Sequence, residues 1–487
     1  MKRMSDLLVK ANEYLSAHRA VKRLSYHITP RFGWLNDPNG LVYFKGEYHV
    51  FYQTCPFETE NTSIFWGHVK SRNLVEWEEC PLALAPDREY DRDGCYTGSA
   101  VVRNEVLFLL YTGHRNTEDG YKETQNIAYS RDGLSFEKYE GNPVIRERPP
   151  HTTRRFRDPK VWRQGSLYYA VIGAEDDNGF GKTVLYCSED MLHFKYSGVF
   201  ADSSGELGNM WECPNFVHMG DKDILILSPK GLKEGQGMSG GFDCGYFSGY
   251  LNWDRKFYRK TQFGRLDYGF DFYAPQVLYM QERNILFGWL SMPDSERKGA
   301  ENGWMNALSI PRELWLDETG ALCMRPVAEL LNLRKEKTAA ENLAGGSVHY
   351  LPEEAGDSLE VILHIKAENE TKSRVCKISG ENPSGKMEFK ILSNNDSVFE
   401  FSFDEQAGSI ELTRGEQKSE TAVGRFSIKE LRIFIDGTAV EIFLNDGRYV
   451  FSSRFYPEKS ISYEVIVPSG KSACLETYRL RRVFSER

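Results

Sequence analysis

The sequence predicts an all-β protein in which a five-bladed β-propeller is followed by a C-terminal β-sandwich. A segment of aromatic and aliphatic residues recurs five times with a period near 60 residues, and repeats of this length form β-sheets of about four strands. No long helical periodicity interrupts residues 30–316. Short strands and hairpin turns then continue toward the end of the chain. Sheets repeated radially around an axis form a propeller, which leaves only short, protected edges.

The repeat is visible in two independent registers. The five strand-like segments are residues 47–53, 106–112, 167–173, 224–230 and 285–291, whose starts are 59, 61, 57 and 61 residues apart. A second series, residues 71–77, 130–136 and 188–194, repeats with spacings of 59 and 58 residues. Both series have the same period and the first has five copies, so the sequence predicts five blades over residues 25–330.

Three further segments flank the propeller. Residues 1–24 are predicted as a helical extension, because their apolar residues are spaced along one face of a short amphipathic helix. Residues 331–346, rich in Lys, Glu and Gly, are predicted as a linker. Residues 347–487 are predicted as a β-sandwich, since alternating strands there are separated by Asp-Gly pairs, which are strong hairpin signals.

The composition excludes several classes of function. The 487 residues carry a formal net charge of −9 and no clustered basic run, so we expect no nucleic-acid partner. The longest apolar runs fall far short of the roughly 20 residues that a membrane-spanning helix needs, so we expect no membrane segment. The N-terminus lacks the apolar stretch of a signal peptide and the nine cysteines form no C-x-x-C pair, which favours a cytoplasmic protein with reduced thiols. No metal-ligand spacing is present, and we expect neither a metal nor a cofactor.

A turn-like segment precedes each repeated strand. The five segments are residues 36–40, 96–100, 157–160, 212–216 and 273–276; four contain Pro, and the second has Gly instead. Because Pro is tolerated at the first residue of a strand, we interpret them as the starts of the innermost strands, which converge on the axis. In three segments the residue before Pro or Cys-Pro is an acid: Asp37, Asp158 or Glu212. One Asp-Pro alone is most often a turn, but three acids in register predict carboxylates that meet in one funnel.

Converging carboxylates are suited to one type of chemistry. They repel one another, so one can stay protonated while another is ionised. Cleavage of a glycosidic bond needs such a pair, an acid for the leaving oxygen and a carboxylate facing the anomeric carbon. Aromatic residues that could stack on a sugar lie on or beside the same segments: Trp34, Trp66, Tyr96, Trp211, Tyr273 and Trp289. The pattern therefore favours a carbohydrate site.

Three motifs carry a specific resemblance. Trp34-Leu-Asn-Asp-Pro-Asn-Gly40, Phe156-Arg-Asp-Pro159 and Trp211-Glu-Cys-Pro214, in this order, resemble the signature motifs of glycoside hydrolase family 32, the family of invertases, sucrose-6-phosphate hydrolases and fructanases. The likeness continues into the second domain at residues 432–436 and 441–447. It covers nearly the whole chain.

The resemblance implies a role for each candidate residue. Asp37 would be the nucleophile that attacks the fructosyl C2, Glu212 the general acid and later the base, and Asp158 the group that, with Arg157, binds ring hydroxyls and stabilises the transition state. Substrate contacts are implied for Trp34, Leu35, Asn36, Gln53, Trp66, Tyr96, Thr97, Arg157, Tyr273 and Trp289. Tyr96-Thr97 stands where many members have Phe-Ser, and Thr97 keeps the hydroxyl donor. The family's reaction retains the anomeric configuration.

The substrate is less closely defined than the chemistry. The leading hypothesis is a retaining β-fructofuranosidase that releases the terminal non-reducing β-D-fructofuranosyl residue of sucrose or sucrose 6-phosphate. Alternatives are an exo-fructanase acting on short inulin- or levan-type oligosaccharides, and a non-catalytic carbohydrate-binding propeller. A phosphate would need cationic partners, for which the candidates are Arg88, Arg115, Arg154 and Arg155. The sandwich is expected to serve packing or subunit contacts, and a homodimer is possible.

Overall fold

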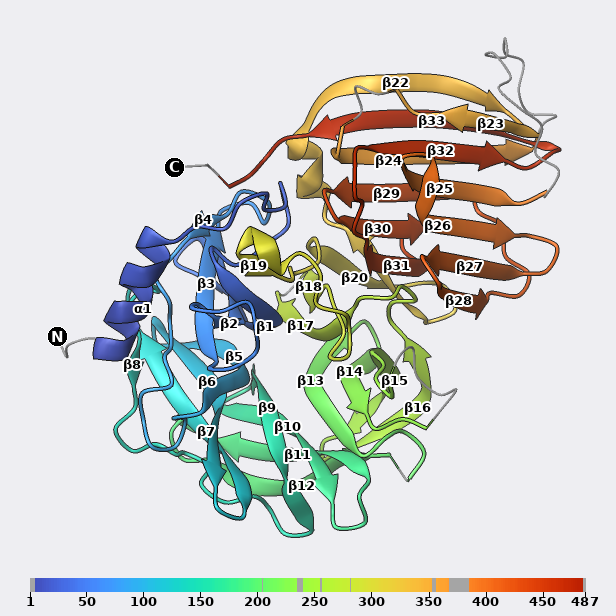
Figure 1. Cartoon of the computed structure of the whole chain (residues 1–487). Coiled ribbons are helices and arrows are strands. Elements are labelled where there is room, and N and C mark those ends of the chain that lie inside the picture. Colours follow the sequence, from blue (N-terminus) through green and yellow to red (C-terminus); the bar gives the residue numbers. More distant parts are fainter. Residues whose placement is uncertain are drawn as a thin grey trace. The chain divides into compact units, whose positions relative to one another are not determined.

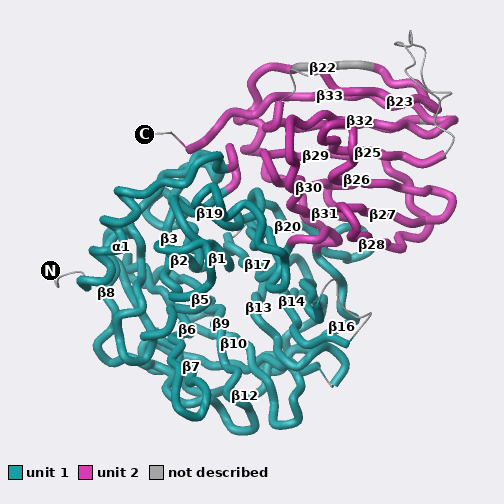
Figure 2. Tube along the Cα trace, viewed as in Figure 1, with its two compact units in different colours: residues 1–23, 28–266, 272–322 teal, residues 24–27, 267–271, 323–487 magenta. Residues whose placement is uncertain are grey.

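The computed structural model describes residues 5–203, 205–233, 240–254, 256–280, 282–352, 356–367 and 385–484, without the side chains of residues 338–341 and 367. The chain divides into two compact units, which Figure 2 colours separately. Unit 1 comprises residues 1–23, 28–266 and 272–322, and unit 2 comprises residues 24–27, 267–271 and 323–487. The regular secondary structure described in both units is almost entirely β-strand.

The described part of unit 1 contains five mainly antiparallel sheets, which follow one another along the chain (Figure 1). The first sheet contains β1 (Gly33–Phe44), β2 (Glu47–Cys55), β3 (Phe65–Ser71) and β4 (Glu78–Glu79), and the second contains β5 (Gly94–Arg103), β6 (Val106–Thr117), β7 (Gly120–Ser130) and β8 (Glu137–Lys138). The third contains β9 (Thr152–Gln164), β10 (Leu167–Asp176), β11 (Gly181–Ser188) and β12 (Lys195–Asp202), and the fourth contains β13 (Met210–Met219), β14 (Lys222–Lys230), β15 (Gly245–Asn252) and β16 (Phe257–Arg265). The fifth includes β17 (Tyr273–Tyr279), β18 (Asn284–Trp289) and β20 (Arg312–Leu316). The repeated segments predicted from the sequence lie in β2, β6, β10, β14 and β18, the second strand of each sheet.

The first strands of the five sheets close a ring. Along the chain β1, β5, β9, β13 and β17 each contact the next, and β17 contacts β1. The first sheet also takes a late strand, β19 (Trp304–Met305), which pairs in parallel with β1. Because a strand from the end of unit 1 joins the sheet formed at its beginning, the ring is fastened by backbone hydrogen bonds as well as by packing.

The second sequence register corresponds to a repeated turn after the third strand of a sheet. In each of its three copies a Ser hydroxyl donates to the Asn or Asp side chain two residues later, in the pairs Ser71–Asn73, Ser130–Asp132 and Ser188–Asp190. The Asn or Asp oxygen then accepts from two backbone N–H groups that follow. Side-chain bonds of this kind stabilise a turn in place of backbone pairing, which explains why the spacing is kept.

The predicted helical extension contains one helix, α1 (Asp6–Ala17). Ser5 caps it by accepting a hydrogen bond from the backbone of Leu8. Its buried face, formed by Leu8, Ala11 and Leu15, packs in one cluster with side chains around β3. No helix among the described residues is long and apolar enough to span a bilayer.

Unit 2 contains two six-stranded sheets that enclose a common apolar core. The first sheet has the order β22-β33-β24-β29-β30-β31 and the second β23-β32-β25-β26-β27-β28. The strands are β22 (Arg334–Ala344), β23 (Ser347–Tyr350), β24 (Ser358–Ala367), β25 (Met387–Ser393), β26 (Asp396–Asp404), β27 (Ser409–Arg414), β28 (Gln417–Ala422), β29 (Glu430–Asp436), β30 (Ala439–Leu444), β31 (Tyr449–Arg454), β32 (Ile461–Val467) and β33 (Lys471–Leu480), with β21 (Leu322–Pro326) preceding them. The arrangement is that of a β-sandwich.

The structure differs from the prediction of a linker at residues 331–346. Most of this stretch is β22, which pairs along its length with β33. Its charged side chains hid the strand from sequence reasoning, because they bond to residues far along the chain: Arg334 to Glu360 and Lys337 to Glu476. The described part of the chain therefore continues from one unit into the next without an extended linker.

Unit 2 contains a buried ionic cluster formed by His27, Asp436 and Glu441. The two acids come from the segments 432–436 and 441–447 singled out in the sequence, and the cluster gives them a structural role. The Asp436 carboxylate accepts hydrogen bonds from the backbone N–H groups of Ser25, Tyr26 and His27 at 2.6, 2.8 and 3.2 Å. The imidazole of His27 lies 2.9 Å from Asp436 and 2.8 Å from Glu441. Although burial opposes it, these two carboxylates raise the pKa of His27 to about 9.

Because of this cluster, we expect the free energy of unfolding of unit 2 to fall at alkaline pH. The pKa of His27 is about 9 in the folded protein against 6.5 for an ordinary histidine. The stabilisation is therefore complete below pH 6.5 and is lost as the pH rises through 9. Replacing His27 with alanine leaves two buried carboxylates without their cation and should cost roughly 3–5 kcal/mol. Urea unfolding between pH 6 and 10 measures both effects.

The control for this prediction is His193→Ala, which removes an exposed histidine paired with Asp190. This variant should keep the alkaline loss of stability that His27→Ala removes. An alkaline loss of equal size in wild type and His27→Ala would contradict the assignment.

Candidate active site

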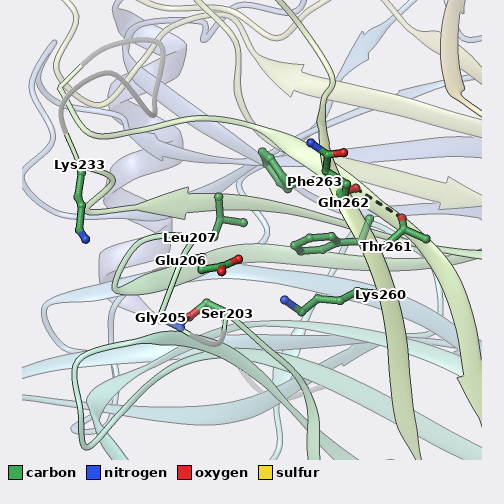
Figure 3. Close-up of a pocket in the computed structure, with 10 residues that line it drawn as sticks. Ser203, Gly205, Glu206, Leu207, Lys233, Lys260, Thr261, Gln262 and Phe263 are labelled. Carbon is green, nitrogen blue, oxygen red and sulfur yellow. Dashed lines mark hydrogen bonds between the residues drawn. The ribbon is translucent and has the colours of Figure 1, made fainter.

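A cavity of about 360 Å³ opens in unit 1 where the first strands of all five sheets meet. Its walls come from Trp34, Asn36, Asp37, Gln53, Asn61, Tyr96, His114, Tyr121, Glu123, Arg157, Asp158, Glu212, Cys213, Lys230, Tyr273, Trp289, Pro293 and Arg297. A second hollow of about 560 Å³ lies in the fourth sheet, with Glu206 and Lys260 among its side chains (Figure 3). None of the predicted site residues is among the described residues that line this second hollow.

The five first strands share one distortion that aims side chains into the cavity. Each loses its pairing register at the same place: at Leu35/Pro38 in β1, Cys95/Gly98 in β5, Arg157/Lys160 in β9, Glu212/Asn215 in β13 and Tyr273/Gln276 in β17. Within these bulges Asp158, Cys213 and Ala274 have φ angles of 66°, 48° and 48°, in the left-handed region. Bulges re-aim side chains, and strained φ values persist where the surroundings enforce them.

The bulges also explain the repeated proline. The sequence interpretation placed Pro at the first residue of the inner strand, but β1 begins at Gly33 and Pro38 lies inside it, at the bulge. The same holds for Pro159 in β9. A bulge interrupts the ladder of backbone hydrogen bonds, so Pro, which has no N–H to donate, costs little within it or directly beside it.

Asp37 is fixed by donors from its own sheet and the next. Its Oδ1 accepts from Asn36 Nδ2 at 3.1 Å, and its Oδ2 accepts from Thr97 Oγ1 at 2.5 Å and Gln53 Nε2 at 3.4 Å. Asn36 is oriented in turn by Trp34 Nε1 and Gln53 Oε1, each at 2.9 Å. Burial raises the pKa of Asp37, while the bonds from Thr97 and Asn36 favour its ionised form.

Asp158 lies beside Asp37 across a buried thiol. Cys213 Sγ is 3.6 Å from Asp37 Oδ2 and 3.7 Å from Asp158 Oδ2. The backbone N–H of Cys213 donates to the same Asp158 oxygen at 3.0 Å. Burial raises the pKa of Asp158 well above its ordinary value, and the negative charges of Glu212 and Asp37 act in the same direction. The three predicted acids therefore form one electrostatic cluster.

Glu212 is ion-paired within this cluster. Its Oε1 accepts from Arg157 Nη2 at 2.6 Å and Nε at 3.2 Å, and its Oε2 accepts from the Tyr273 hydroxyl at 2.7 Å. Burial would raise the pKa of Glu212, but the charges of Arg157 and Lys230 and the hydrogen bonds from Arg157 and Tyr273 together keep this pKa below its ordinary value.

Glu123 is a site residue that sequence reasoning missed. It is buried, and its carboxylate lies 3.4 Å from Arg157 Nη1 on the side away from Glu212. It also accepts from the backbone of Phe156 at 2.9 Å and lies 3.5 Å from His114. No motif marks Glu123, but it pairs across the β6–β7 hairpin with His114, a residue near the predicted sugar segments. Predicting that hairpin register could have found it.

The structure brings most of the predicted site residues together at the cavity. Trp34, Asn36, Asp37, Gln53, Tyr96, Arg157, Asp158, Glu212, Tyr273 and Trp289 line it. Thr97 is buried behind Asp37, to which it donates. Leu35 and Trp66 do not line the cavity; both are fully buried, and Trp66 Nε1 donates to the carbonyls of Cys95 and Tyr96 at 3.1 and 3.2 Å.

The predicted phosphate-binding arginines do not reach the cavity. Arg88, Arg115, Arg154 and Arg155 are absent from its described lining. Arg115 and Arg155 pair with Glu89 and Glu175. Cations at the cavity come instead from Arg157, Lys230 and Arg297. Within the described residues, no group of three or more His, Cys, Asp or Glu side chains is placed to hold a metal ion.

Carboxyl groups that meet in an aromatic-walled cavity are the groups with which a glycoside hydrolase works. Comparison with known families agrees with this class. The N-terminal domain of glycosyl hydrolases family 32 matches residues 27–326, and the C-terminal domain of the same family matches residues 329–479. The chain belongs to glycosyl hydrolases family 32.

Individual relatives span nearly the whole chain. A sucrose-6-phosphate hydrolase of Bacillus subtilis is 36% identical over 463 residues, which are 92% of each protein. A raffinose invertase of Escherichia coli is 34% identical over 473 residues, 94% of each. Among solved structures, a β-fructofuranosidase of Bombyx mori has a TM-score of 0.86 at 32% identity and covers 98% of each chain. A mutant of that enzyme in complex with sucrose has a TM-score of 0.87 at 32% identity and covers 99% of each chain.

Proposed function

We propose that the protein is a retaining β-fructofuranosidase that hydrolyses the terminal non-reducing β-D-fructofuranosyl residue of sucrose or sucrose 6-phosphate. The observation that carries this function is the cluster of Asp37, Asp158 and Glu212, converging on one cavity with Arg157 bonded to Glu212. The relatives named as sucrose-6-phosphate hydrolases and invertase, and the sucrose complex of the Bombyx mori enzyme, support the substrate class.

The proposed reaction proceeds by two displacements. Ionised Asp37 attacks C2 of the fructosyl unit while Glu212 donates its proton to the departing oxygen, which leaves as the hydroxyl of the glucosyl unit. Glu212, now ionised, takes a proton from water, and the water oxygen displaces Asp37 and releases fructose. Asp158 and Arg157 bind ring hydroxyls, and the carboxylates stabilise the positive charge that develops on the ring. Two inversions at C2 give net retention.

We also propose that the five sheets of unit 1 are the five blades of a propeller whose axis passes through the cavity. The closed ring of first strands supports this interpretation. So does the bulge found at the same place in all five of these strands. Cytoplasmic localisation and a homodimer stay predictions from the sequence.

The alternatives use the same first subsite and are separated by kinetics. An exo-fructanase would prefer a short inulin-type oligosaccharide, and a carbohydrate-binding propeller would release no sugar. The experiment compares kcat/KM for sucrose, sucrose 6-phosphate and such an oligosaccharide in phosphate-free buffer, and follows the first product by NMR. We expect fructose release from the sucrose substrates and, with added methanol, methyl β-fructofuranoside. No release, or the α-fructoside as transfer product, would contradict the proposal.

Replacing Glu123 with glutamine is expected to move the pH optimum of kcat/KM to lower pH. Without the Glu123 charge, Arg157 pairs with Glu212 alone, which favours ionised Glu212 and lowers its pKa. Above the optimum, the fraction of protein with protonated Glu212 falls, so kcat/KM should fall about 3–10-fold. Below the optimum the rate follows ionisation of Asp37 and should not change. Full pH profiles of kcat/KM measure this.

Glu118→Gln is the matched control, since Glu118 is an exposed acid at the β6–β7 turn. Its profile should superimpose on that of wild type. A Glu123→Gln profile lowered equally at all pH values would indicate a folding defect and contradict a role through Arg157.

A further inference from the structure

We propose that Lys230 recognises the phosphate of a leaving group that carries one, so that this side chain makes sucrose 6-phosphate a better substrate than sucrose. This inference rests on the proposed function. The inference goes beyond the proposed function because it names the residue that binds the phosphate and the part of the substrate that carries it.

Lys230 reaches the cavity from the last position of β14. In the β13–β14 pair Glu212 lies opposite Ser228 and Met210 lies opposite Lys230, so Lys230 is the diagonal neighbour of Glu212 on the same face. Diagonal neighbours lie within reach of long side chains. Both Lys230 and Glu212 line the cavity.

The position of the ammonium group is fixed by aromatic packing. Lys230 Nζ lies 5.5 Å from the centroid of the Phe242 ring, and that ring packs edge-on against Tyr273 with centroids 5.7 Å apart. The Tyr273 hydroxyl donates to Glu212 Oε2. The lysine thus belongs to the same wall as the proposed proton donor, and its charge, after that of Arg157, opposes the effect of burial on the pKa of Glu212.

This wall must face the leaving group. The proton of Glu212 goes to the glycosidic oxygen that departs with the glucosyl unit, so the glucosyl unit lies on the Glu212 side of the bond. A phosphate on that sugar is a dianion near neutral pH. Lysine binds phosphate as a compact charge with several donors.

Of the cavity's cations, Lys230 is the one whose charge is least committed to other groups. Arg157 is shared between Glu212 and Glu123. Arg297 pairs with Glu60 at 3.5 Å and covers the Trp34 ring. Among the residues that the structure describes, no ion pair holds Lys230. An ammonium group in a cavity without a carboxylate partner is suited to an anionic ligand.

The test compares wild type with Lys230→Gln on two substrates that differ only in the phosphate. We expect the ratio of kcat/KM for sucrose 6-phosphate to kcat/KM for sucrose to fall roughly 10–100-fold, as for loss of a hydrogen bond to a charged group. Loss of the Lys230 charge also changes the pKa of Glu212, but this affects both substrates alike and cancels in the ratio. Inhibition of sucrose hydrolysis by glucose 6-phosphate should weaken by a similar factor, while inhibition by glucose should not. Lys230→Arg, which keeps the charge, should restore most of the preference.

Lys260→Gln is the matched control, because Lys260, like Lys230, places its ammonium group over an aromatic ring: Nζ lies 5.1 Å from the centroid of Phe247. Lys260 lines the second hollow and not the active-site cavity (Figure 3). This variant should leave both substrates unchanged. An equal loss of activity on sucrose and sucrose 6-phosphate in Lys230→Gln, or no loss on either, would overturn the inference while the proposed function stands. Hydrolysis of neither substrate by wild type would overturn the proposed function itself. If Lys230→Gln does not fold, Lys230→Met and Lys230→Arg provide the same comparison.

Discussion

Replacing Asp37 with asparagine is expected to lower kcat/KM for sucrose by at least about 10⁴-fold, as for other residues that act as a unit in catalysis. Asparagine has nearly the same shape, and its single side-chain oxygen can keep the bonds from Thr97 and Gln53, although its amide nitrogen cannot accept from Asn36. Its amide does not form the fructosyl–enzyme bond. The loss should therefore appear in kcat, with little change in the binding of sucrose. Initial rates and isothermal titration with sucrose measure the two quantities separately.

The control for this variant is Asp93→Asn, which removes the charge of an acid at the start of the second sheet, outside the lining of the cavity. Asp93→Asn should keep wild-type kinetics. An Asp37→Asn variant that retains a tenth or more of wild-type kcat would show that another group attacks C2. Weak binding of sucrose together with a lowered unfolding midpoint would instead point to a collapsed cavity.

The convergence of the three acids could be predicted from sequence because it follows from the repeat. Once the period near 60 residues is recognised, Asp37, Asp158 and Glu212 fall within three successive positions of the same bulge in three of five units. The bulges of the first strands meet at the ring that these strands form. The period thus brings together, to within two positions, side chains that are up to 175 residues apart, from Asp37 to Glu212.

Residues outside the inner strands could not be placed by the same argument. Glu123 and Lys230 lie on β7 and at the end of β14, and they reach the cavity through hairpin register and side-chain length. Glu123 lies outside the repeated segments, and although Lys230 ends the fourth of them, no motif marks it. The bulges also limited the prediction from sequence, because side chains do not alternate strictly between the two faces of a strand through a bulge. Leu35 belongs to the predicted motif, yet its side chain is fully buried away from the cavity.

Replacing Glu212 with glutamine is expected to slow sucrose hydrolysis by roughly 10²–10⁴-fold, the contribution of a positioned acid and base. The size of the loss should depend on the leaving group. The glucosyl unit of sucrose leaves as an alkoxide unless Glu212 protonates its oxygen, whereas the aryl group of an aryl fructoside leaves as a stable phenolate without help. Formation of the fructosyl–enzyme from an aryl fructoside should therefore stay fast in Glu212→Gln, and its breakdown by water, which needs the same residue as base, should become the slow step.

This order of steps can be tested by adding azide to the Glu212→Gln variant. Azide is a nucleophile that needs no general base, so it should accelerate turnover of the aryl fructoside and give the β-fructosyl azide with retained configuration. Glu206→Gln, in the second hollow, is the control and should respond to azide no more than wild type does. No acceleration would contradict the base role of Glu212. Because azide replaces only the base, acceleration on the aryl fructoside with none on sucrose would assign both proton transfers to this one carboxyl group.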